Sequence, residues 1–206
     1  MSSRFTLEDD SSSSPPAISL LSNGRYTVLL TEAGSGYSSV DGMDVTRWRE
    51  DAICDSGGEY FYIRDLETGQ VWSAGRQPLG RSTDEDAADL RPDHATLWRR
   101  DGEIETRYEI AVVPDANADV RRITLTNHGS RRRTLSITSY LEVALSPRRA
   151  DQAHPAFAKL FLETMWLPET AALLCRRRPR ARDQQPVWAV HVLADPKDIS
   201  SMRSGT

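Results

Sequence analysis

The residues best suited to chemistry occupy five consecutive positions, Arg47, Trp48, Arg49, Glu50 and Asp51. Guanidinium groups and carboxylates hydrogen-bond hydroxyl groups, and the face of an indole ring can stack on a sugar ring. One interpretation is therefore a binding site for a polyhydroxylated ligand. The other is structural, with an Arg–Glu–Asp ion-pair network at the end of a strand and the indole in the core. The sequence leaves both open.

Asp93 and His94 form a second candidate pair, because an adjacent carboxylate and imidazole can exchange protons. They fit a surface position equally well, and we treat them as outlying members of the same substrate-binding site. Glu103 and Glu105 share one face of a predicted strand, where nothing raises the pKa of either as glycoside hydrolysis requires. The sequence shows no recognisable triad of a nucleophile, a general base and an orienting group, so no catalytic residue is assigned.

The sequence predicts neither a metal site nor a cofactor. Its four histidines are scattered, and the two cysteines, Cys54 and Cys175, match no metal-binding spacing. Cys175 follows an apolar run and is predicted to be a small buried residue. The segment 34–36 (Gly-Ser-Gly) lacks the third glycine, the Lys-Ser/Thr end and the helix of a phosphate-binding loop, so it is predicted to be a hairpin loop.

Composition narrows the function class. The net charge of −4 over 206 residues argues against nucleic acid as a partner. No window approaches ~18 consecutive apolar residues, and the N-terminus lacks the pattern of a secretory signal, so a cytoplasmic location is expected. Polar, pattern-poor ends predict a disordered leader over 1–17 and a disordered tail over 195–206, which flank one folded domain over 18–194.

Within that domain, strand patterns predominate. Asn23 and Gly24 form a turn before a strand over 25–31, and Asp101-Gly102 joins two strands, 95–100 and 103–113, as a hairpin. The acidic stretch 82–92 is predicted to be a short helix or an ordered loop. About ten strands and no long amphipathic helix predict an all-β fold, an antiparallel sandwich or barrel. The remaining predicted strands cover 59–64, 70–73, 120–126, 135–145, 157–167, 170–176 and 187–194, with Trp72, Trp98, Trp166 and Trp188 in the core.

The candidate site should lie where a strand ends irregularly, at about 46–51. The turn-forming residues on either side of this segment favour such an end. In a regular strand Arg47 and Arg49 would share one face and Trp48 would take the other, so only an irregular end directs both arginines and Glu50 into one cleft.

The order and spacing of several motifs resemble a known family. The motifs are 20–26 (LLSNGRY), 33–38 (AGSGYS), 45–51 (VTRWRED), 62–65 (YIRD), 121–127 (RRITLTN), 138–143 (TSYLEV) and 154–157 (HPAF). Together they resemble the N-terminal β-sandwich of glycoside hydrolase family 94, formerly glycosyltransferase family 36. The resemblance is greatest to the C-terminal phosphorylase-like region of cyclic β-1,2-glucan synthases.

The resemblance implies a super-sandwich of the galactose-mutarotase-like type. It also implies a separate (α/α)6 barrel that carries the catalytic residues, and no part of this sequence corresponds to that barrel. The expected function is thus a carbohydrate-facing module, a fragment or truncated relative of a cyclic β-glucan synthase or glycoside phosphorylase that is not catalytic alone. Its expected partners are a β-glucan or gluco-oligosaccharide, a separate barrel domain or chain, and further copies of itself as a homo-oligomer.

Two alternatives stay open. One is an independent mutarotase-like sugar epimerase, which needs His94, His154 or His191 to meet Glu142 or Glu163 in one concave face. The other is a non-functional truncated product. The resemblance also implies association of the parent synthases with the bacterial inner membrane.

Overall fold

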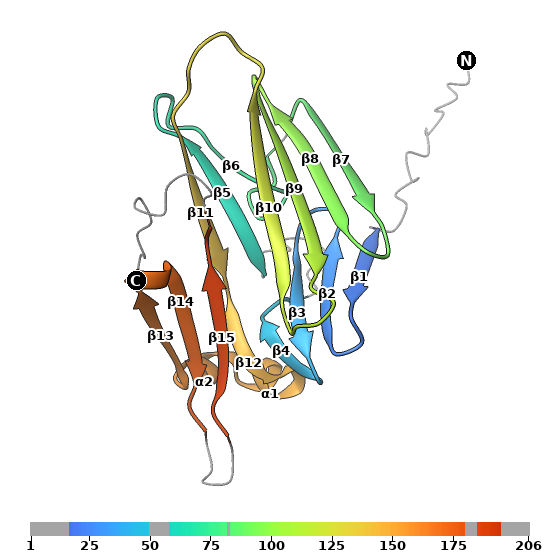
Figure 1. Cartoon of the computed structure of the whole chain (residues 1–206), viewed down its shortest axis with the longest axis vertical. Coiled ribbons are helices and arrows are strands. Elements are labelled where there is room, and N and C mark those ends of the chain that lie inside the picture. The colour runs from blue at the N-terminus through green and yellow to red at the C-terminus, as the bar shows by residue number, and fades with distance from the viewer. Residues whose placement is uncertain (1–16, 50–57, 82, 180–184, 195–206) are drawn as a thin grey trace, which may run out of the picture.

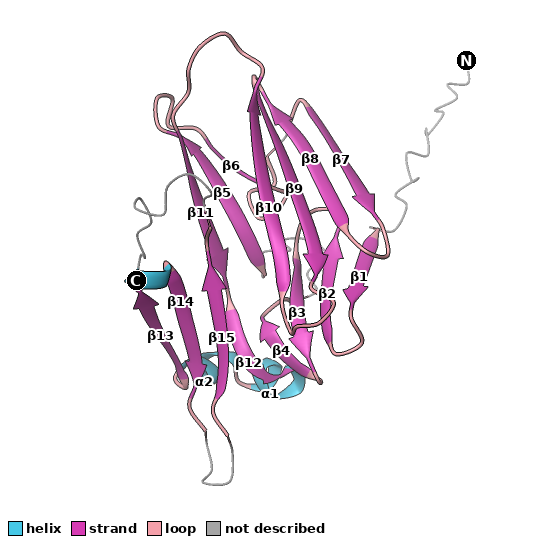
Figure 2. Cartoon of the chain, in the orientation of Figure 1, coloured by secondary structure: helices cyan, strands magenta, loops and turns pink. Residues whose placement is uncertain are grey.

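The structure, a computed structural model, describes residues 17–49, 58–81, 83–179 and 185–194. Within these residues the chain forms four antiparallel sheets and only short helices (Figures 1 and 2). The predicted all-β antiparallel fold is therefore confirmed. The predicted leader, except for its last residue, and the predicted tail lie outside the described residues.

The strands group by sheet in the following order. One sheet contains β1 (Ile18–Ser22), β2 (Tyr26–Thr31), β3 (Gly36–Val40), β4 (Met43–Thr46) and β12 (Val143–Pro147), and a second contains β10 (Asp119–Asn127), β9 (Ile104–Val112), β8 (Ala95–Asp101) and β7 (Glu85–Leu90). Two three-stranded sheets contain β11 (Leu135–Leu141), β5 (Glu59–Asp65) and β6 (Val71–Ser73), and β13 (Leu162–Leu167), β14 (Ala172–Arg177) and β15 (Val187–Val192). The helical elements are α1 (Arg148–Ala153), α2 (Pro155–Lys159) and a 3-10 turn, η1 (Pro168–Thr170).

The core lies where the first three sheets face one another. Strand β9 shows why it forms, since Ile104, Thr106, Tyr108 and Ile110 are buried at alternate positions. This period of two presents one face of the strand to apolar partners. Side chains from β2, β5 and β8 complete the cluster, among them Val28, Ile63 and Leu97.

Both short turn signals are confirmed. Gly24 and Gly102 have φ angles of 94° and 61°, which glycine adopts without the steric cost that other residues incur. In register, Asp101 pairs with Ile104 across the second turn. The predicted hairpin loop at 34–36 is also present, because the N–H of Thr31 donates to the carbonyl oxygen of Ser35 at 2.8 Å.

Two element predictions were wrong. The acidic stretch is strand β7, whose side chains from Glu85 to Asp89 are exposed. It is extended because its backbone pairs with β8 along its whole length. This pairing outweighs the low intrinsic strand propensity of its acidic and alanine residues. The predicted strand over 157–167 begins as helix α2, where Pro155 at the first position fixes a helical φ, and β13 starts only at Leu162.

Three further expectations need correction. The strand predicted over 135–145 is two strands, because the chain breaks at Glu142 and Leu145 has a φ of 46°. Trp188 is 47% exposed and so is not a core residue, whereas Trp72 is buried as predicted. The count of about ten strands was low, since β1, β3 and β4 were not predicted.

Candidate functional site

Arg47 lies directly after β4, where the strand ends as predicted and residues up to Arg49 are irregular. The N–H of Arg47 donates to the carbonyl oxygen of Glu142 at 2.6 Å, which fixes the chain's exit from the sheet. Its side chain is only 5% exposed. The guanidinium donates through Nε and Nη2 to the two oxygens of Asp151, each at 2.5 Å, and through Nη1 to Oε1 of Glu142 at 2.6 Å.

These contacts join three elements that are distant in sequence. Asp151 is the buried acidic residue of α1, and Glu142 occupies the break between β11 and β12. Lys159, at the end of α2, donates to the same oxygen of Glu142 at 2.9 Å. The site therefore contains two cations and two carboxylates, and its charges balance.

Electrostatics keep Arg47 and Glu142 ionised at neutral pH. The hydrogen bond to Asp151 raises the pKa of Arg47, although burial opposes the rise. Burial would raise the pKa of Glu142, but hydrogen bonds from Lys159 and Arg47 outweigh it and lower that pKa. Glu142 is consequently a carboxylate that accepts hydrogen bonds and cannot donate one.

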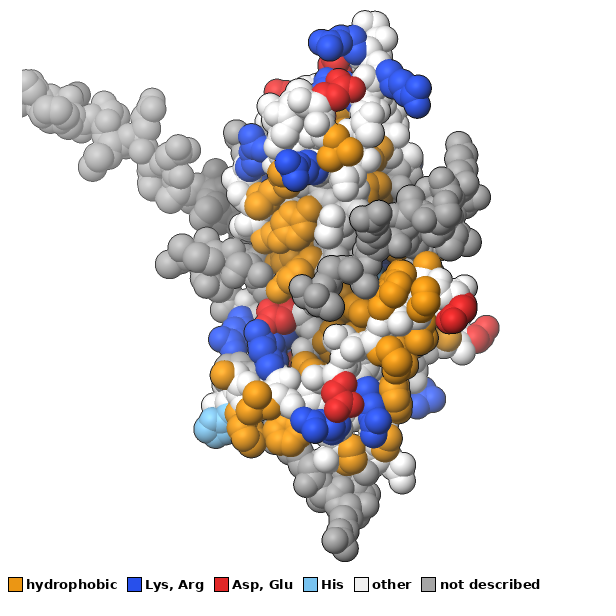
Figure 3. All heavy atoms as spheres, turned by 90° about the vertical axis from the view of Figure 1, so that its left-hand side faces the viewer, with side chains coloured by type: hydrophobic (Ala, Val, Ile, Leu, Met, Phe, Trp, Pro, Cys, Tyr) orange, Lys and Arg blue, Asp and Glu red, His pale blue; other side chains and the backbone are white. Residues whose placement is uncertain are grey.

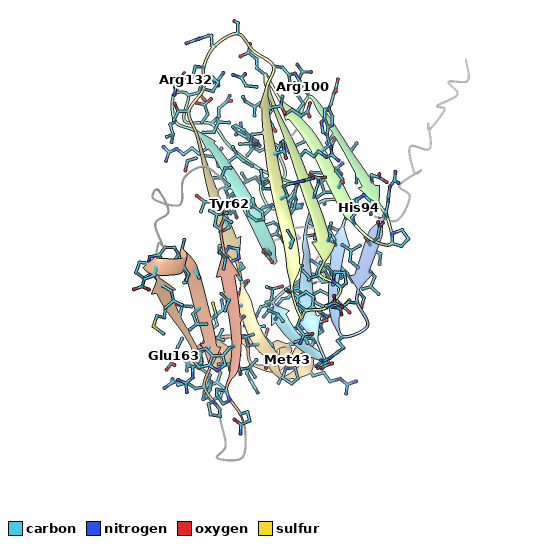
Figure 4. The ribbon with its side chains drawn as sticks, viewed as in Figure 1. Met43, Tyr62, His94, Arg100, Arg132 and Glu163 are labelled. Atoms are coloured by element: carbon cyan, nitrogen blue, oxygen red, sulfur yellow. The ribbon has the colours of Figure 1, made fainter. Side chains whose placement is uncertain are left out.

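An open hollow of about 250 Å³ lies beside the network. The elements that carry it include β12, α2, β13 and β14, which lie in the lower part of the molecule, where Glu163 of β13 and Met43 of β4 are labelled (Figure 4). Its wall combines the charged groups with apolar side chains. The lining residues are Arg47, Leu141, Glu142, Val143, Lys159, Leu162, Thr164 and Cys175.

The other predicted residues of the 47–51 segment have different surroundings. The ring of Trp48 stacks on that of Tyr37, with centroids 6.0 Å apart and planes 17° apart, and the guanidinium of Arg148 lies 3.8 Å from the Tyr37 centroid. Arg49 is exposed. Glu50 and Asp51 lie outside the described residues. Of the three residues of this segment that the structure describes, only Arg47 lines the hollow.

Asp93 and His94 are not part of this site. They lie in the turn between β7 and β8, and the labelled His94 is well separated from the lower end of the molecule (Figure 4). The imidazole Nδ1 is 3.0 Å from the Asp93 carboxylate, whose side chain is 80% exposed. The hydrogen bond from His94 lowers the pKa of Asp93, as in an ordinary surface pair.

Sequence reasoning did not assign Asp151, Lys159 or Thr164 to the site. Asp151 lies 104 residues beyond Arg47 in the chain, and no spacing rule links them. Composition offered one signal, since Lys159 is one of only two lysines in the sequence. A rare residue type in an arginine-rich chain is a reasonable place to look for a specific contact.

The pairs required for an epimerase do not occur among the described contacts. Nε2 of His191 lies 2.8 Å from Oγ of Ser139, and Glu163 pairs with Arg178 at 3.2 Å. Neither Glu142 nor Glu163 contacts a histidine among the described residues. In that same part of the chain no group of three His, Cys, Asp or Glu could hold a metal ion, and no helix has the length and apolar character of a membrane span.

Comparison with known proteins places this geometry in context. The family described as "Glycosyl hydrolase 94, supersandwich domain" matches residues 2–204. The cyclic beta-(1,2)-glucan synthase NdvB of Rhizobium meliloti (strain 1021) is 33% identical over 176 residues, which are 85% of this chain and 6% of that protein. The N,N'-diacetylchitobiose phosphorylase of Vibrio proteolyticus is 25% identical over 161 residues, 74% of this chain and 20% of the relative.

A solabiose phosphorylase of Paenibacillus borealis is 32% identical over 89 residues, 43% of this chain and 12% of the relative. The chain thus spans a fifth or less of the length of these three relatives.

Proposed function

The chain belongs to the glycosyl hydrolase 94 supersandwich family, and from that premise we propose that it is a carbohydrate-facing module without catalysis of its own. Its ligand is a β-glucan or gluco-oligosaccharide, bound at the hollow beside Arg47. The relatives support a carbohydrate ligand, because their names refer to a β-(1,2)-glucan, N,N'-diacetylchitobiose and solabiose.

The observation that carries the proposal is the charge-balanced, hydrogen-bonded network at the wall of the hollow, in which Asp151 lies behind Arg47. Two cations and two carboxylates leave no net charge to attract an anion, which favours a neutral polyol over a phosphate. Both cationic contacts of Glu142 use Oε1, so a hydroxyl group can donate to the same carboxylate. Apolar side chains such as Leu141 and Val143 suit the C–H face of a sugar ring.

The size of the hollow limits what it can hold. At about 250 Å³ it is smaller than the ~300–1,000 Å³ typical of sites for drug-sized ligands, which suits one sugar unit of a longer chain. A sugar exchanges hydrogen bonds with water for similar bonds with protein, so the net gain is small. The expected dissociation constant is about 1 mM, or roughly −4 kcal/mol.

The same contacts argue against turnover at this site. Two cations lower the pKa of Glu142 and keep it ionised at neutral pH. It therefore has no proton to donate as a general acid, a role that needs a carboxyl group with a raised pKa. Asp151 is buried beneath the Arg47 guanidinium, out of reach of a ligand in the hollow. In this proposal the groups that react with the sugar come from a separate barrel domain or chain.

The test is a ¹⁵N NMR titration with β-1,2-gluco-oligosaccharides, with inorganic phosphate as the charged control. Shifts should cluster at residues 141–143, 159, 162 and 164, and Glu142→Gln should weaken binding about fivefold by removing a charge-assisted hydrogen bond. Glu163→Gln is the matched control, because Glu163 is an exposed carboxylate of β13 that does not line the hollow. Arg49→Ala tests whether the segment 47–51, predicted from sequence to bind the ligand, contributes to affinity. Shifts clustered elsewhere, or equal affinity for wild type and Glu142→Gln, would overturn the assignment.

A further inference from the structure

A buried charge cluster lies where three of the sheets meet. At its centre is Arg121 of β10, whose Nε donates to Asp119 at 2.6 Å and whose Nη1 donates to the Tyr108 hydroxyl at 2.7 Å. Its Nη2 lies 3.1 Å from Oε2 of Glu59, the first residue of β5. The hydroxyl of Tyr26, on β2, donates to the other oxygen of Asp119 at 2.6 Å. The three charged side chains are each 10% exposed or less.

Among the described residues, the titratable groups next to this cluster add no charge to it at neutral pH. Burial raises the pKa of both tyrosines, Tyr26 and Tyr108, so both stay neutral. Burial and the nearby Arg121 lower the pKa of His191 of β15, which keeps its ring neutral. One guanidinium therefore faces two carboxylates, and full ionisation would leave a net charge of −1 away from water, which is costly.

Geometry decides which carboxylate retains a proton. Asp119 accepts hydrogen bonds from Arg121 and Tyr26, which lower its pKa although burial opposes them. Among the described residues Glu59 has one, longer contact with Arg121, and burial raises its pKa to about 7 against that attraction. The proton therefore belongs to Glu59.

Glu59 is connected directly to the hollow. It pairs in register with Leu141, which lines the hollow. The preceding residue, Gly58, accepts a hydrogen bond from the N–H of Glu142 at 3.2 Å, and the carbonyl of Glu142 accepts from Arg47. Any displacement of the start of β5 must therefore move two residues of the hollow wall.

We propose that this cluster is a proton-operated control of the hollow. With Glu59 protonated, the cluster is neutral and holds Leu141 and Glu142 in the arrangement described above. When Glu59 releases its proton to water, the excess negative charge loosens the start of β5 and the end of β11, and the wall of the hollow loses its order. The inference rests on the proposed function for the ligand, but the proton control is a property of the chain alone.

The sign of the effect on stability follows from linkage. The pKa of Glu59 is raised from its ordinary value of 4.5 to about 7 in the folded chain. Its contribution to the free energy of unfolding is full below about pH 4.5, falls as the pH rises, and is lost above about pH 7. Ligand binding must in return raise the pKa of Glu59, because coupling is reciprocal.

The first experiment needs no ligand. Amide shifts of Leu141 and Glu142 should titrate with a midpoint near pH 7 in the wild type and should be flat in Glu59→Gln, with exposed Glu103→Gln as a matched control. ¹³C-carboxyl NMR of wild-type Glu59 gives the same midpoint if the variant does not fold. A carboxyl midpoint below about pH 5.5, or a titration of these amides that persists in Glu59→Gln, would overturn the proposal.

The second experiment adds β-1,2-gluco-oligosaccharide at pH 6 and pH 8. Wild type should bind about fivefold more weakly at pH 8, at the low end of usual coupling, and Glu59→Gln should bind equally at both. Equal wild-type affinity at the two pH values would disprove control of the hollow. If no sugar binds at either pH, the proposed function fails, and the ligand-free amide titration still decides whether the cluster controls residues 141 and 142.

Discussion

Arg47 was predicted from sequence to contact a ligand directly, and the structure gives its guanidinium protein partners instead. The sequence suggested that its guanidinium contacts a ligand, but in the structure the fork is occupied by Asp151 and Glu142. The structural interpretation, an Arg–Glu–Asp network at a strand end, describes it better, although both acids come from distant segments. If the hollow binds a sugar as proposed, the contribution of Arg47 is to position Glu142 at the wall.

Replacing Arg47 should therefore mainly lower the free energy of unfolding, and affect ligand binding only indirectly. Arg47→Ala leaves two carboxylates, one of them the 4%-exposed Asp151, without their shared cation, and we expect a loss of about 3 kcal/mol. Arg49→Ala is the matched control, because an exposed arginine should change stability by less than about 0.5 kcal/mol. Urea unfolding of both variants provides the measurement. A loss under about 1 kcal/mol for Arg47→Ala would mean that the ion pairs are not structural.

At the scale of elements, the hairpin of β2 and β3 depends on one glycine. A Cβ at Gly36 would lie 1.9 Å from the carbonyl oxygen of Leu29 on the paired strand, and backbone there cannot move aside cheaply. Gly42, in the next turn, has open space around its Cβ position and only a φ of 81° to favour glycine. Gly36 also has a φ of 156°, so it combines steric contact with an unfavourable backbone conformation, whereas Gly42 has the backbone conformation alone.

We expect Gly36→Ala to destabilise the chain by about 3 kcal/mol or more, since it forces the paired strands apart. Gly42→Ala should cost about 1 kcal/mol, the usual penalty for a left-handed conformation in a residue with a Cβ. Thermal unfolding followed by circular dichroism compares them. Similar midpoints for the two variants would show that the β2–β3 pairing tolerates rearrangement at Gly36.

What could be predicted from sequence depended on the range of the interaction. The turns at Asn23-Gly24 and Asp101-Gly102 and the strand predicted over 103–113 depend on local signals, and all three were predicted correctly. Strand β7 was missed because its extended conformation depends on pairing with β8. Helix α2 was missed because its only sequence signal is one proline at its first position. The same holds for the candidate site. Arg47 belongs to a motif visible in the sequence, whereas its partners Asp151 and Glu142 are brought to it only by tertiary contacts.

At the scale of the whole molecule, one sheet has an unusual surface. The outward face of the β13–β14–β15 sheet exposes Met165, Trp188, Val190 and Val192 by about half or more of their surface. Strand register places Met165 beside Val190 through Leu174, so these residues form a continuous strip. Figure 3, viewed from the side that carries β13, shows hydrophobic side chains gathered on the lower half of the molecule among charged ones. Contiguous apolar surface of this kind favours association.

The purified chain should consequently self-associate, and the strip should be the contact. Sedimentation velocity over a hundredfold concentration range should show a rising average mass for wild type. Val190→Asp should restore a monomer, because a carboxylate in an apolar contact loses hydration without gaining a partner. Val120→Asp is the matched control, since Val120 of β10 is 59% exposed and Val190 is 60% exposed, but Val120 lies on a different sheet. A wild-type chain that stays monomeric at every concentration, or an equal response to the two substitutions, would mean that the strip is not an association surface.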